Sequence, residues 1–134
     1  MTSELRVDNL KGSTTGGSIN VLGEGTSATT NLQQGLAKAW VNFNGTGTAV
    51  INDSINVASL TDNDTGQFTF AFSNSMNNST YSITATSGQS NSWSSTEFIG
   101  SYATGSFKIE TGATNSSARA DWNNNNGTIH GDLA

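Results

Sequence analysis

The chain has 134 residues, a net charge of −5 and no cysteine, and apolar residues make up only 33% of it. Serine, threonine, asparagine and glycine account for about half of the sequence. These counts exclude a disulfide scaffold, a thiolate metal site and a cysteine nucleophile, and no apolar run approaches the roughly 18 residues of a membrane span.

Residues 1–36 are a mixture of branched aliphatic residues and glycine, and their few extended stretches are too short to form a stable sheet alone. We interpret this segment as an attachment or interlocking arm that orders by docking, with a floppy terminus as the alternative. A short helical turn is predicted at residues 31–36, with Asn31 as its N-cap. The side chains expected to make the arm's contacts are Leu5, Val7, Leu10, Ile19, Val21 and Leu22.

Residues 37–134 alternate between apolar and polar side chains with a period of two, and turn signals recur every 8–12 residues. This spacing is typical of an antiparallel sandwich or barrel, and we predict an all-β antiparallel β-sandwich of about eight short strands. A dense turn is expected at residues 61–66, and a hairpin is expected to join residues 68–72 to 81–85. The predicted strands cover residues 39–43, 48–52, 55–59, 67–73, 81–86, 98–102, 106–110, 118–122 and 128–133.

Large apolar side chains are few, so a single copy buries only a modest core, and burial between subunits would stabilise the fold. Trp40 opposes Val41 and Phe43 in its strand, so both faces of that strand carry apolar bulk. We expect the core or a subunit interface to include Trp40, Phe43, Phe68, Phe70, Phe72 and Trp122.

Catalytic chemistry is not predicted. The single histidine, His130, has no evident partners for a triad or a metal site, so we expect no enzyme activity, no metal and no cofactor. Asp62 and Asp64 are interpreted as turn-closing residues rather than calcium ligands or catalytic carboxylates.

Charged residues are sparse and unevenly distributed. Residues 39–107 contain no lysine or arginine, which argues against nucleic-acid partners and against binding to anionic membranes. Lys108 with Glu110, and Arg119 with Asp121, are expected to form solvated or cross-strand pairs.

Aromatic rings beside amide side chains raise a glycan-binding hypothesis, because rings stack on the apolar faces of sugars and amides bond to hydroxyl groups. Trp93 lies in a polar stretch with Asn91, which makes it the best candidate for an exposed contact. The residues proposed to contact a glycan are Trp93, Asn91 and Tyr102.

Several segments together resemble a module common in tail-fibre and related virion proteins of tailed bacteriophages, especially marine ones. The resemblance rests on Ala-Trp-Val-Asn-Phe-Asn-Gly-Thr-Gly-Thr at residues 39–48, on residues 51–66, and on Met-Asn-Asn-Ser-Thr-Tyr at 76–81. Residues 5–12 are similar to the N-terminal attachment start of such proteins, and residues 129–134 to their closing strand, except that His130 replaces a more usual apolar residue.

The resemblance implies a virion protein, made in the host cytoplasm and assembled on the phage particle as a homotrimer. Its partners would be other copies of itself, other proteins of the tail or capsid and, for an adhesin, host-surface polysaccharide. Two alternatives remain: a capsid decoration protein that stabilises the shell, and a freestanding lectin-like module.

Overall fold

The computed structural model describes residues 4–22, 28–88, 95–112 and 118–134, and of residues 95–99 only the backbone. The chain divides into two units, Met1–Leu36 and Ala37–Ala134. This division falls where the aliphatic and glycine-rich composition gives way to the period-two pattern. The attachment role of the first unit stays a prediction.

In the first unit, β1 (Asn20–Leu22) pairs antiparallel with β2 (Thr29–Asn31), which leads directly into the one-turn helix α1 (Leu32–Gly35). Asn31 caps this helix, since its side-chain oxygen accepts a hydrogen bond from the Gln34 backbone N–H at 3.2 Å. The predicted helical turn and its cap are therefore confirmed. None of the described residues in 4–36 is buried, so the described part of this unit has no apolar core of its own.

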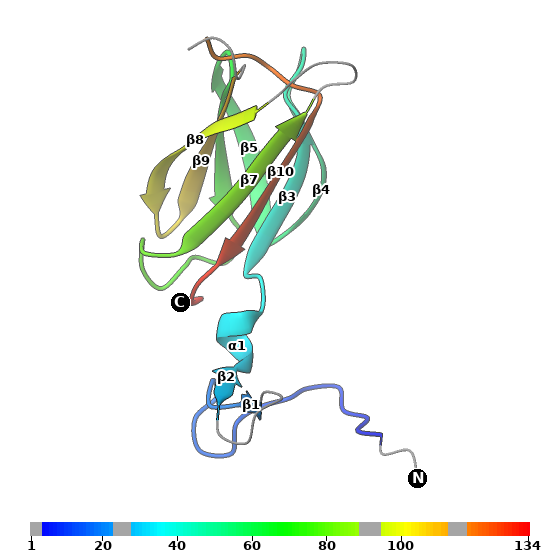
Figure 1. Cartoon of the computed structure of the whole chain (residues 1–134), viewed down its shortest axis with the longest axis vertical. Coiled ribbons are helices and arrows are strands. Elements are labelled where there is room, and N and C mark those ends of the chain that lie inside the picture. Colours follow the sequence, from blue (N-terminus) through cyan, green and yellow to red (C-terminus); the bar gives the residue numbers. More distant parts are fainter. Residues whose placement is uncertain (1–3, 23–27, 89–94, 113–117) are drawn as a thin grey trace. The chain divides into compact units, whose positions relative to one another are not determined.

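The second unit consists of two four-stranded antiparallel sheets that pack face to face, which confirms the predicted all-β sandwich (Figure 1). One sheet has the order β4-β3-β10-β7 and the other β5-β6-β9-β8. The first sheet is built from β3 (Ala39–Asn44), β4 (Val50–Ile55), β7 (Ser82–Gly88) and β10 (Asn124–His130). The second is built from β5 (Val57–Asp64), β6 (Gln67–Phe72), β8 (Ser95–Ala103) and β9 (Ser106–Gly112).

Side chains that alternate along the strands form the core between the sheets. In β3 and β6 every second residue is buried, as a period-two pattern requires. The aromatic residues of this core come from β3 in the first sheet, from β6 and β9 in the second, and from the segment before β7: Phe43, Phe68, Phe70, Phe72, Phe107 and Tyr81.

The predicted hairpin between residues 68–72 and 81–85 is wrong. β6 pairs with β5 and β9, whereas β7 pairs with β10 in the opposite sheet. The connecting segment crosses from one sheet to the other, and Met76 within it forms a bridge to Leu133. Apolar faces on both strands suit contact across the core as well as pairing side by side, so the pattern did not distinguish the two arrangements.

Several predicted boundaries also differ from the structure. The last strand, expected at 128–133, runs instead from Asn124 to His130. The strands expected at 48–52 and 55–59 are displaced to β4 and β5, because Asn56 takes a left-handed backbone conformation (φ 54°) between them. The dense turn at 61–66 is mostly strand: β5 runs to Asp64, and Asn63 donates to the Thr69 hydroxyl at 2.8 Å. Residues 118–122 form no strand, only a bridge between Gly112 and Arg119.

Tyr81 joins the start of β7 to the hairpin between β8 and β9. Its hydroxyl lies 3.0 Å from the Ala103 carbonyl oxygen and 2.9 Å from that of Ser106. Burial raises the pKa of Tyr81 above its ordinary value, and a hydroxyl that donates to a carbonyl oxygen is likewise stable as the neutral phenol. The neutral phenol is therefore the form that the folded protein favours.

We predict that Tyr81→Phe lowers the free energy of unfolding by about 1–2 kcal/mol at neutral pH, because the hydrogen bond is lost. The raised pKa adds a pH dependence. The unfolded chain ionises first, so the wild-type protein should lose stability as the pH rises above about 10, the ordinary tyrosine pKa. Denaturant unfolding at pH 7 to 11 measures both effects, and an equal alkaline loss in Tyr81→Phe would contradict this assignment.

Gly66 closes the β5–β6 turn with φ +64°, and a Cβ there would lie 2.3 Å from the Thr111 backbone oxygen. We predict that Gly66→Ala costs about 3 kcal/mol or more, from left-handed strain together with a clash against backbone. Gly47 is the matched control, since its φ is +67° but nothing lies within 4 Å of a Cβ there. Gly47→Ala should cost only about 1 kcal/mol. Equal costs in thermal unfolding would rule out the steric argument.

Candidate functional site

The aliphatic side chains predicted to make the arm's contacts are largely exposed in the first unit. Leu5 is 77% exposed and Leu22 is 61% exposed, and Val7, Leu10 and Val21 are also exposed. Ile19 is partly buried, and its carbonyl accepts a hydrogen bond from the Leu32 N–H at 2.8 Å. Such a concentration of exposed aliphatic residues on a unit without a core is typical of a surface that another chain covers.

Of the residues proposed to contact a glycan, Trp93 and Asn91 lie outside the described residues. Tyr102 lies in β8, where its ring packs on Tyr81 with a centroid distance of 5.3 Å and remains 42% exposed. Tyr102 therefore closes one edge of the aromatic core as well as facing solvent.

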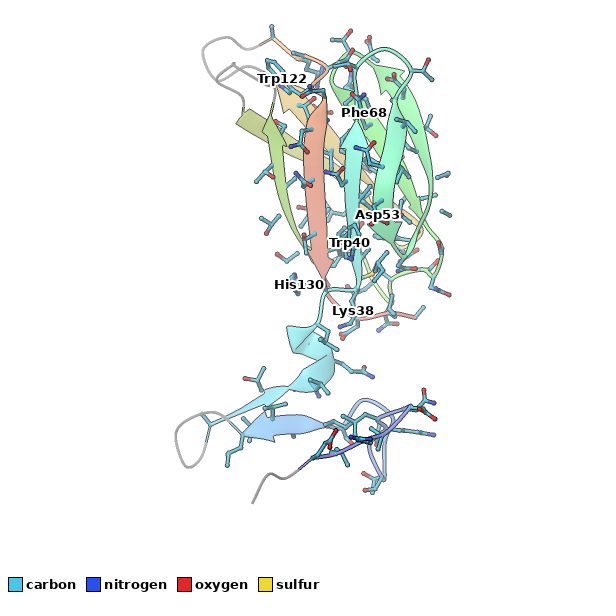
Figure 2. The ribbon with its side chains drawn as sticks, turned by 90° about the vertical axis from the view of Figure 1, so that its right-hand side faces the viewer. Lys38, Trp40, Asp53, Phe68, Trp122 and His130 are labelled. Carbon is cyan, nitrogen blue, oxygen red and sulfur yellow. The ribbon has the colours of Figure 1, made fainter. Side chains whose placement is uncertain are left out.

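The two tryptophans predicted at the core or a subunit interface have different environments. Trp122 is buried at one end of the sandwich, and its indole N–H donates to the Gly112 carbonyl at 3.1 Å. Trp40 is only partly buried and lies on the outer face of β3, on the side opposite Val41 and Phe43. Figure 2 shows Trp40 toward the end of the sandwich near Lys38 and His130, with Trp122 at the other end.

The outer face of the sheet β4-β3-β10-β7, which we call the Trp40 face, is a surface that the sequence analysis missed. The strand register sets Trp40 beside Thr128 of β10 and Ile55 of β4, with Thr84 of β7 next to Thr128. A second row follows along the strands. It consists of Asp53, Asn42, Asn126 and Thr86.

Hydrogen bonds between side-chain amides hold this second row in place. The Asn42 amide nitrogen donates to the Asn126 side-chain oxygen at 2.7 Å and to that of Asn124 at 3.1 Å. The Asn42 side-chain oxygen in turn accepts from the Asn52 amide at 2.8 Å. The network runs across three strands, and a β-bulge between Asn42 and Phe43 places Asn52 within reach.

Charge is nearly absent from the Trp40 face. The strands β3, β4, β7 and β10 contain no lysine or arginine, and Asp53 is their single carboxylate. His130 stands exposed at the end of β10, and Lys38, just before β3, lies near Trp40 at the same end of the face (Figure 2). The face therefore offers an indole ring, amides and hydroxyl groups, but few charges.

The opposite sheet carries a compact ion cluster. Glu110 has a side chain only 11% exposed, with Lys108 at 3.0 Å and Arg119 at 2.6 Å. The expected pair of Arg119 with Asp121 is wrong, because Arg119 turns to Glu110 and Asp121 accepts a hydrogen bond from the Gly66 N–H at 2.6 Å. Burial alone would raise the pKa of Glu110, but the hydrogen bonds from Arg119 and Lys108 outweigh it, and its pKa lies below the ordinary value.

Other chemistry is sparse in the part of the chain that the structure describes. There, no three histidine, aspartate or glutamate side chains gather into a group that could hold a metal ion. Asp64 accepts a hydrogen bond from the Thr65 N–H at 2.8 Å, a contact that helps to close the turn. No described helix is long and apolar enough to cross a membrane.

Comparison with known proteins found no match for this chain, whether among protein-family models, curated proteins or solved structures.

We predict that Glu110→Gln lowers the free energy of unfolding by about 1–2 kcal/mol at pH 7, because two charged partners lose their counter-charge. The depressed pKa fixes the sign of the pH dependence. The stabilisation is present above the unfolded-state pKa, about 4.3, and disappears as the pH falls through the folded-state value. Urea unfolding from pH 7 to 2 should show a shallower acid loss for Glu110→Gln than for wild type, and parallel curves would contradict the assignment.

Proposed function

We propose that this protein is a structural component of a bacteriophage particle, a fibre-like appendage. In this proposal, residues 1–36 attach the chain to the particle and residues 37–134 form the displayed domain. The observation that carries the proposal is the pairing of a sandwich that has its own core with a separate unit that has none. The motifs at residues 39–48, 51–66 and 76–81 supply the resemblance to tail-fibre and related virion proteins.

The first unit has the properties of an attachment segment. Most of its branched aliphatic side chains are exposed, and each of these contributes about 1.5–3 kcal/mol when fully buried against a partner. The sheet β1-β2 has only two strands, so each of them has an unpaired edge that can accept a strand from a partner. Both features favour binding to a protein surface or interlocking with other copies.

We further propose that the assembly is a homotrimer held together mainly by the first unit. The sandwich already covers its aromatic core, whereas residues 4–22 and 28–36 leave most of their aliphatic side chains exposed. The gain from association is therefore greatest in the first unit, where burial replaces exposed apolar surface.

We predict that a chain truncated to residues 37–134 folds but is not incorporated into phage particles. Its thermal unfolding should remain cooperative, because the core lies entirely within that unit. The measurement is mass spectrometry of particles purified from a host in which the truncated gene replaces the full one. Truncated protein found at full occupancy in particles would refute the attachment role.

A point variant tests the aliphatic contact of the first unit without shortening the chain. Val21→Asp places a charge on an exposed aliphatic residue of β1, and Asn20→Asp places the same charge on its exposed neighbour. We expect Val21→Asp to reduce incorporation at least several-fold and to lower the native mass measured by light scattering, while Asn20→Asp leaves both unchanged. Equal effects of the two variants would show that charge alone, and not the aliphatic contact, is responsible.

A further inference from the structure

We propose that the Trp40 face binds an uncharged polysaccharide chain. The inference rests on the proposed function, because it names the surface of the displayed domain that would meet the host. It also places the contact on a sheet face rather than in the segment that contains Trp93.

The first observation is the position of the indole. Trp40 is the large aromatic residue of this face, partly exposed between Thr128 and Ile55 on the neighbouring strands. A partly exposed ring fixed by a central strand suits stacking against the apolar face of a sugar, since it offers apolar area with little rotamer entropy to lose.

The second observation is the set of amides beside the indole. The side-chain oxygens of Asn124 and Asn126 accept from Asn42, so the amide nitrogens of these two residues are left to donate to a ligand. Asn52 donates to Asn42 and so keeps its side-chain oxygen as an acceptor. Because the network already fixes these side chains, a ligand loses less free energy in ordering them.

The third observation is the charge of the face. Its four strands supply no lysine or arginine to pair with phosphate, sulfate or carboxylate groups, and Asp53 would repel them. Lys38 lies just before β3 at the Trp40 end of the face, and it already has an interaction within the chain. The chain as a whole carries a net charge of −5. An uncharged ligand rich in hydroxyl groups therefore matches this surface better than an anionic one.

The dimensions of the face suit several sugar rings. Along β3, the distance from Trp40 to Asn44 is about 13 Å at the usual strand rise, and the four strands span about 14 Å. Thr84 and Thr86 extend the row of hydroxyl groups to the edge strand β7. A linear chain lying across the strands would meet the indole or the amides and then these hydroxyls.

The test uses the purified full-length protein and a panel of immobilised uncharged polysaccharides (dextran, mannan, galactan and a β-glucan). Binding is measured by interferometry, and native mass by light scattering. Trp40→Ala should weaken binding at least roughly tenfold, as expected for loss of a stacked ring. Thr84→Arg should block the face without removing the indole, and should weaken binding to a similar extent.

Thr61→Arg is the matched control. Thr61 is also an exposed threonine in an edge strand, but on β5 of the opposite sheet. The proposal would be supported if both face variants lose binding while Thr61→Arg binds as the wild-type protein does. The native mass and the thermal midpoint of the face variants should also equal those of the wild type.

Three results would overturn it. They are no binding of any panel member by the wild-type protein, binding that survives both face variants, and a fall in native mass on Thr84→Arg, which would identify the face as an interface between copies. These outcomes are independent of particle incorporation, so failure of the attachment role is recognised separately.

Discussion

Contact between aromatic rings of the two sheets is the interaction on which the rest of the structure depends. Phe43 of one sheet meets Phe68 and Phe70 of the other at centroid distances of 5.0 and 4.9 Å. Phe107 continues the row, 5.0 Å from Phe70. Rings bury more apolar area per residue than aliphatic side chains do, so a chain with few apolar residues can still close a sandwich around a short row of them.

A core of rings makes small residues necessary at the points where backbone approaches it. A Cβ at Gly45 would lie 2.5 Å from the Phe68 ring, and one at Gly127 would lie 2.8 Å from the Ile109 side chain. Gly45, just after β3, lets the backbone approach a ring of the second sheet, and Gly127 of β10 lets the first sheet approach an aliphatic side chain of the second. The apolar residues are thereby concentrated inside, and the outer faces are left to threonine and asparagine, which can form hydrogen bonds with a ligand or with one another.

Local alternation along the chain is enough to predict individual strands such as β3 and β6, and the fold class follows from their number and spacing. Pairing is not predictable in the same way. The alternating Phe68, Phe70 and Phe72 show that one side of β6 is buried, but not whether Ile83 lies beside it or across the core from it. Boundaries fail where one residue's backbone decides them, as the left-handed Asn56 does between β4 and β5.

The Trp40 face shows why the proposed binding surface is harder to predict than the fold. Asn126 is far in the sequence from Trp40 and Asn42, and single asparagines give no signal in a chain so rich in them. Only the register of β10 on β3 brings the three residues together. The ion cluster around Glu110 lies on the other sheet, where Lys108 and Glu110 stand in β9 beside Gly100 of β8. One sheet is thus held partly by ion pairs on its outer face, and the other by amides that carry no charge. An uncharged ligand would compete with nothing stronger than water on the amide sheet, whereas on the ion-paired sheet it would have to displace charged partners.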